Sequence, residues 1–222
     1  MRSRIKAEKT RLGLKESLIQ NVGNLTNRIQ KFVDCRSKDI DKRELFIVEG
    51  DSALTSCKLA RDAEFQAIIP VRGKTLNCLK ASFDKIMKND IILDLIKVIG
   101  CGAEIQGKTK AAQNTFDLSL LKWSKIIICT DADEDGFQIR TLLLTLFYRL
   151  LPTLIKEHQV YIAQTPLFEL TCKDKTYFAY DEFEKTDILR SLGDQKYKLQ
   201  RSKGLGENSP EMMALTTMNP AT

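Results

Sequence analysis

Short apolar runs alternate with helix-like segments between residues 45 and 166 of this 222-residue chain. The runs are LFIVEG (45–50), AIIPVRG (67–73), KIIICTD (125–131) and VYIAQTP (160–166). Continuous apolar runs of this length indicate strands that are covered on both faces. The alternation predicts an α/β fold with a four-stranded parallel sheet flanked by helices. In such a fold, functional side chains gather at the carboxyl ends of the strands.

The segments between the runs carry helical signals. DSALTSCKLARD starts at residue 51 with Asp and Ser, which favour a helix start. LKASFDKIMKNDIILDLIKVIG has helical spacing with a break expected near Asn89 and Asp90, and residues 139–156 form a long apolar pattern that predicts one helix.

A different pattern follows Pro166. FELTCKDKTYFAY predicts two short strands about a Lys-Asp-Lys turn, and a helix over 181–192 and the strand-like KYKLQRSKGLGE come after it. We therefore expect residues 44–166 to form one domain and residues 167–222 to form a separate, small α+β tail region, which we expect to be truncated.

The net charge of +6 is concentrated at the N-terminus. Lys and Arg outnumber Asp and Glu by 12 to 5 in residues 1–43, whereas the remaining residues carry 23 against 24. The segment 3–20 reads as a surface helix, and VGNLTNR then breaks it. We interpret residues 1–43 as a basic helical connector, whose charge suits either a solvated surface or a polyanion such as DNA.

Composition excludes several classes of protein. No apolar run approaches the roughly 20 residues that a membrane-spanning helix needs, and the N-terminus is too charged for a signal peptide. We therefore expect a cytoplasmic protein without a membrane partner. The six cysteines contain no CxxC pair and only His158 could join them, which argues against zinc and favours buried free thiols.

Three aspartates, Asp131, Asp133 and Asp135, directly follow the third strand, and Glu49 ends the first. A calcium loop of the DxDxDG type needs Glu at its twelfth position, where this chain has Leu142. A purely structural turn accounts for one aspartate, but three would repel one another. Mg²⁺ prefers such hard oxygen ligands and assists displacement at phosphorus, so we favour a magnesium site.

VEGDSA (48–53) followed by TDADEDG (130–136) resembles the Toprim domain, the metal-binding module of topoisomerases, bacterial primases and some nucleases. Further segments resemble the B subunits of bacterial type IIA DNA topoisomerases, those of DNA gyrase and topoisomerase IV. These segments are QAIIPVRGKTLN (66–77), IRTLLLTLFYR (139–149), VYIAQTPLFEL (160–170), SKGLGE (202–207) and TTMNP (216–220). In one departure, Leu54 and Thr55 replace two glycines of the family, which bears on the turn after Asp51.

The resemblance implies roles for individual residues. Glu49, Asp131 and Asp133 would be the catalytic Mg²⁺ ligands, and Asp135 a second-metal or outer-shell ligand; Mn²⁺ or Ca²⁺ would substitute in binding. The positions that match DNA-facing residues of the family are Arg72, Lys74 and Asn77. The supporting positions are Asp51, Arg140 and Lys203.

The resemblance also implies partners and an activity. A tyrosine of an A subunit would cleave double-stranded DNA reversibly, and ATP bound in preceding domains would drive strand passage for supercoiling, relaxation or decatenation. The parent enzyme would be a heterotetramer of two A and two B subunits, associated with the bacterial nucleoid. The chain alone would bind Mg²⁺ and DNA and cleave nothing. The alternatives are a Toprim primase or nuclease, and a binding module whose acidic turn is structural.

Overall fold

The computed structural model describes residues 29, 31–104, 116–202 and 204–221. Its centre is a parallel sheet of four strands in the order β2-β1-β3-β4. The strands are β1 (Glu44–Glu49), β2 (Gln66–Val71), β3 (Lys125–Cys129) and β4 (Val160–Ile162). All four predicted strands are therefore present, in the predicted parallel arrangement.

Both faces of the parallel sheet are covered. On one face, α4 (Asp90–Ile99) and α5 (Glu134–Leu150) pack their apolar side chains against alternate strand residues such as Ile47 and Ile128. On the other face, α2 (Gly50–Ala60) packs against the residues that point the opposite way, such as Phe46. Coverage on both sides explains why the strands are continuously apolar.

The helices differ from the sequence prediction at two places. The helix predicted over 139–156 begins earlier, at Glu134, and is interrupted after Leu150; α6 (Pro152–Lys156) continues the chain. Pro152 lacks a backbone N–H and starts a new helix readily. The break predicted near Asn89 is present between α3 (Phe83–Ile86) and α4.

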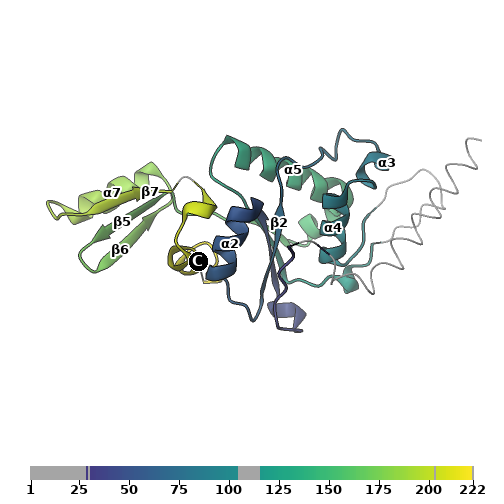
Figure 1. The fold of residues 1–222 in the computed structure, drawn as a ribbon, viewed down its shortest axis with the longest axis horizontal. Coiled ribbons are helices and arrows are strands. Elements are labelled where there is room, and N and C mark those ends of the chain that lie inside the picture. The colour runs from purple at the N-terminus through teal and green to yellow at the C-terminus, as the bar shows by residue number, and fades with distance from the viewer. Residues whose placement is uncertain (1–28, 30, 105–115, 203, 222) are drawn as a thin grey trace, which may run out of the picture.

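The tail begins with a small antiparallel sheet in the order β6-β5-β7. Its elements are β5 (Phe168–Cys172), β6 (Lys175–Ala179), α7 (Glu182–Leu192) and β7 (Lys198–Arg201). In Figure 1 this unit projects from one end of the molecule. The two short strands and the helix agree with the prediction.

The end of the tail returns to the parallel sheet. After the short 3-10 helix η4 (Leu205–Glu207), α8 (Pro210–Leu215) lies against α2, as the yellow segment of Figure 1 shows. Leu205, Met213 and Met218 are buried in the same cluster as residues of β1 and α2. The tail thus differs from the separate unit expected from the sequence, because its last apolar residues cover the second face of the sheet.

Part of the predicted connector also packs on the sheet. Val33 forms an isolated antiparallel bridge with Ile68 of β2, and a 3-10 helix, η2 (Ile40–Lys42), precedes β1. The helix expected over 3–20 lies outside the described residues. None of the described helices is both long enough and apolar enough to span a membrane. Five of the six cysteines are buried; Cys35 is partly exposed.

Candidate metal centre

Glu49 and Asp131 lie side by side at the carboxyl edge of the parallel sheet. β1 and β3 pair with Val48 opposite Cys129, so that Glu49 ends its strand beside the first residues after β3. The backbone N–H of Asp131 donates to Glu49 Oε2 at 3.1 Å. The strand ends therefore bring these two predicted site residues into contact.

Two glycines shape the turns that carry the carboxylates. Gly50 follows Glu49 with a φ of +76°, which glycine adopts without steric cost. Gly136 lies in the first turn of α5, where a Cβ would stand 2.1 Å from the backbone oxygen of Asp131. Asp133 caps the same helix, because its Oδ1 accepts from the N–H of Gly136 at 2.7 Å. A side chain would be excluded by lack of space at Gly136 and would strain the backbone at Gly50.

The residues that replace the family's two glycines lie inside a regular helix. Leu54 packs against the apolar cluster beneath α2, and Thr55 Oγ1 donates to the backbone oxygen of Asp51 at 3.1 Å. α2 runs without interruption through both positions. In this chain, the residues after Asp51 are therefore part of a continuous helix.

Burial and neighbouring carboxylates raise the pKa values of Glu49 and Asp131. Partial burial raises the pKa of Glu49, and the charges of Asp131, Asp133 and Asp135 raise it further. Burial also raises the pKa of Asp131, against the lowering effect of a hydrogen bond from Leu205. The charged forms of Glu49 and Asp131 are therefore less stable here than in water, and this favours binding of a cation or a proton.

The donor set suits Mg²⁺, which takes hard oxygen ligands and usually keeps several waters beside one or two carboxylates and a substrate phosphate. Within the described residues, no group of three or more His, Cys, Asp or Glu side chains is arranged so that it could hold a metal ion. The arrangement fits a metal held by part of the cluster and shared with a phosphate, rather than one enclosed by protein alone.

The predicted DNA-facing cations lie beside the same edge, after β2, and are paired with acidic residues. Lys74 Nζ lies 2.9 Å from Asp135 Oδ1, and Arg72 Nε lies 3.5 Å from Asp51 Oδ1. Lys31 also pairs with Asp51, and this hydrogen bond, together with the charge of Arg72, lowers the pKa of Asp51. These side chains are between 41% and 70% exposed, so the pairs are weak and exchangeable.

Of the remaining predicted site residues, Asn77 and Arg140 do not contact the carboxylates in any interaction within the described part of the chain. Asn77 uses its side-chain oxygen in a turn, where it accepts from the backbone N–H groups two and three positions further along the chain, at 3.0 and 3.2 Å. Arg140 donates to Thr130 Oγ1 and lies over the ring of Phe137, rather than pairing with the aspartates. Lys203 lies outside the described residues.

The sequence did not single out Leu205 as a site residue. Its backbone N–H donates to Asp131 Oδ1 at 2.7 Å, from a position 74 residues away in the chain. The SKGLGE segment was notable only for its resemblance. No local pattern could have paired these residues, because the contact depends on the return of the tail to the sheet.

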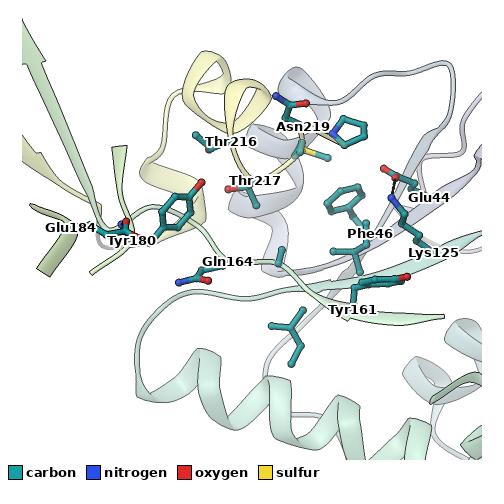
Figure 2. A pocket seen from close by; sticks show the side chains of 15 residues that line it. Glu44, Phe46, Lys125, Tyr161, Gln164, Tyr180, Glu184, Thr216, Thr217 and Asn219 are labelled. Atoms are coloured by element: carbon teal, nitrogen blue, oxygen red, sulfur yellow. Dashed lines mark hydrogen bonds and ion pairs between the residues drawn. The ribbon is translucent and has the colours of Figure 1, made fainter. Parts of the chain in front are cut away.

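A cavity of about 690 Å³ lies apart from these residues, between the parallel sheet, the start of α7 and the C-terminal segment (Figure 2). Figure 2 shows Tyr161 and Tyr180 on its sides and the paired Glu44 and Lys125 at one end. None of the described candidate residues lines it. This cavity is therefore separate from the candidate metal centre.

A family model described as the Toprim domain matches residues 44–165, more than half of the chain. The chain belongs to the Toprim family. The parallel sheet and both candidate carboxylate turns of this Toprim chain fall within the match. A second model, the carboxyl terminus of the DNA gyrase B subunit, matches residues 194–222. This match lies in the tail. The alternative of a Toprim primase or nuclease does not account for it.

Curated relatives confirm the predicted resemblance to topoisomerase B subunits. The DNA gyrase B subunit of Thermotoga maritima is 46% identical over 203 residues, which are 91% of this chain and 30% of the relative. That of Metamycoplasma arthritidis is 44% identical over 222 residues, or 100% of this chain and 33% of the relative. The Toprim chain thus spans about a third of the length of these relatives.

A solved structure agrees with these relatives. The DNA-binding, cleavage and re-ligation domain of Plasmodium falciparum topoisomerase II superposes with a TM-score of 0.69 at 26% identity. The match covers 84% of this chain and 26% of that one.

Proposed function

We propose that this chain is the Toprim part of the B subunit of a bacterial type IIA DNA topoisomerase. The observation that carries the proposal is the contact of Asp131 with Glu49 across two adjacent strand ends. Lys74 and Arg72 stand beside that edge. Similarity to DNA gyrase B subunits over nearly the whole chain supports the assignment.

In this proposal, Glu49, Asp131 and Asp133 bind Mg²⁺, for which Mn²⁺ or Ca²⁺ substitutes, and Asp135 contributes a second or outer-shell ligand. The bound metal supplies electrostatic stabilisation of the scissile phosphate and the departing 3′ oxygen. In the metal-free chain, burial and the neighbouring carboxylates raise the pKa of Glu49. It acts as general acid in cleavage and as general base in rejoining.

The basic residues after β2 bind the DNA backbone. Arg72 and Lys74 exchange their exposed ion pairs with Asp51 and Asp135 for phosphate oxygens. Asn77 presents its amide nitrogen as a donor, since its oxygen closes the turn. Arg140 and Lys203 keep the supporting roles that the resemblance implies.

The parent enzyme supplies the other parts. A tyrosine of an A subunit is the nucleophile, ATP binds outside this chain, and two A and two B subunits act on double-stranded DNA in the bacterial cytoplasm, at the nucleoid. Strand passage, by supercoiling, relaxation or decatenation, belongs to that assembly. The chain by itself binds metal and DNA and cleaves neither strand.

Reconstitution of the full-length protein with its A subunit tests this function. Asp133→Ala should reduce Mg²⁺-dependent DNA cleavage and strand passage by roughly 100-fold or more, since losing even an outer-shell partner of a metal costs about 10–100-fold. Asp174→Ala, in the turn between β5 and β6, is the matched control and should retain activity. Full activity of Asp133→Ala, or cleavage of supercoiled DNA by the isolated chain, would contradict the proposal.

A further inference from the structure

The loop that starts η4 lies directly against the candidate metal centre. Leu205 donates its N–H to Asp131 Oδ1 at 2.7 Å. Its side chain is only 1% exposed, in a cluster with Val48 and Cys129 on the second face of the sheet. Packing of the side chain therefore fixes the backbone of the loop, and with it the direction of the N–H toward the carboxylate.

Gly204 approaches the other side of the same carboxylate. A Cβ on Gly204 would stand 2.8 Å from Asp131 Oδ2 and 3.1 Å from its Cγ. The backbone of Gly204 is extended, with φ −166° and ψ 162°, a conformation open to any residue. The side chain is thus excluded by lack of space beside Asp131 and not by backbone strain.

The space that Gly204 leaves is small and lies at the carboxylate. A crevice of about 10 Å³ is bordered by Asp131, Gly204 and Leu205, together with neighbouring residues. About 10–15 Å³ of such volume accommodates one water-sized ligand. A methyl group on Gly204, which also borders this crevice, would press against Oδ2.

Gly206 provides a contrast within the same loop. A Cβ there would stand 2.8 Å from the Cβ of Ser52, on α2, and the backbone oxygen of Gly206 accepts from Ser56 Oγ at 3.4 Å. This glycine anchors the loop to the helix. The nearest atoms to its added Cβ all belong to Ser52, whereas those to Gly204 all belong to Asp131.

We propose that the backbone of Gly204 and Leu205 is a positioning element for Asp131. The N–H of Leu205 holds Oδ1 in one orientation. Because Gly204 has no side chain, Oδ2 stays accessible to a divalent cation or to a water molecule bound to that cation. The inference rests on the proposed metal-binding function. A ligand fixed by surrounding hydrogen bonds binds a metal more tightly, because it loses less conformational freedom on binding.

Two measurements on the 222-residue chain test the proposal: its Mn²⁺ affinity and its melting temperature. Both are made on the unaltered chain, on Gly204→Ala and on Gly206→Ala. Both variants add one methyl group in a tight loop, so both should melt at a lower temperature. Only Gly204→Ala should also weaken Mn²⁺ binding, by about 10-fold or more, as the loss of an outer-shell partner does. A purely structural role would lower the melting temperature alone.

The possible outcomes separate the two proposals. Equal Mn²⁺ affinity of Gly204→Ala and the unaltered chain would overturn the positioning role and leave the metal site standing. Failure of the unaltered chain to bind Mn²⁺ would overturn the metal site and the positioning role together.

A second measurement applies if Gly204→Ala does not fold. In the unaltered chain, Mn²⁺ should broaden the amide resonance of Leu205 over the same concentrations that broaden the amide of Gly136, because both N–H groups bond to candidate ligands. Broadening at Gly136 without broadening at Leu205 would overturn the positioning role.

Discussion

At the scale of single residues, backbone N–H groups hold the carboxylates of the candidate centre. Asp131 Oδ1 accepts from Leu205, Asp133 Oδ1 from Gly136, and Glu49 Oε2 from Asp131. An amide side chain keeps an accepting oxygen and loses the charge. Substitution by Asn or Gln therefore tests charge repulsion separately from hydrogen bonding.

The double variant Asp131→Asn with Asp133→Asn should melt at a higher temperature than the unaltered chain when metal is removed. The physical reason is the loss of repulsion among the carboxylates, with about 1 kcal/mol corresponding to roughly 2–4 °C in a chain of this size. Addition of Mg²⁺ should stabilise the unaltered chain but not the variant. Thermal melts with chelator and with Mg²⁺ measure both effects, with Asp187→Asn on α7 as the control. An unchanged metal response would contradict the metal site.

Glu49→Gln should stabilise the metal-free chain at neutral pH, and the gain should shrink on acidification. Because the pKa of Glu49 is raised in the folded state, the folded chain binds the proton more tightly than the unfolded chain. The penalty for its charge is complete above the raised pKa and disappears below the ordinary carboxyl pKa of about 4.3. Urea unfolding of both chains between neutral and acidic pH measures the difference. A gain that grows as the pH falls would refute the assigned cause.

At the scale of elements, α5 fixes the direction of the acidic turn. Asp133 is its N-cap, and Glu134 and Asp135 lie in its first turn, where acidic residues are stabilised by the helix dipole. The sequence predicted a later start because residues 134–138, EDGFQ, lack the apolar pattern of the rest of the helix. The cap and the dipole extend the helix into the acidic motif.

Asp133→Ala should lower the free energy of unfolding of the metal-free chain by about 1 kcal/mol, the usual cost of a lost N-cap, in excess of any gain from reduced repulsion. Asp133→Asn preserves the capping oxygen and should not show this loss. Urea unfolding in the presence of chelator compares the two variants. Equal stabilities would show that the cap contributes little to α5.

At the scale of the whole molecule, the tail has two structural parts. The small sheet with α7 has its own apolar cluster, which includes Phe168 and Leu170. The segment 204–220 instead completes the second face of the parallel sheet. The metal centre is therefore assembled from Toprim strands and from a loop that the chain reaches only after crossing the small sheet.

Leu205→Ala should lower the free energy of unfolding by about 2–5 kcal/mol, as expected when a buried leucine is truncated. Leu199→Ala, on the exposed surface of β7, should change it by less than about 0.5 kcal/mol. Urea unfolding monitored at Trp123, which is buried in the main core, reports the effect on the parallel-sheet domain. Similar small effects of both variants would show that the tail does not stabilise this domain.

The α/β class, the four strands and the carboxylates at their ends were predictable from the amino-acid sequence. These features depend on local information: a continuous apolar run marks a doubly covered strand, and parallel strands end at one edge. Leu142 at the twelfth position likewise excluded a calcium loop without any structure. The resemblance of short motifs then identified the family.

The groups that surround these carboxylates were not predictable, because they depend on the tertiary fold. The bond from Leu205 to Asp131 and the close approach of Gly204 require the burial of Leu205 against the sheet. Lys74 likewise meets Asp135 only because β2 and β3 flank β1. Such contacts follow from how distant apolar residues pack together, and no local pattern records that packing.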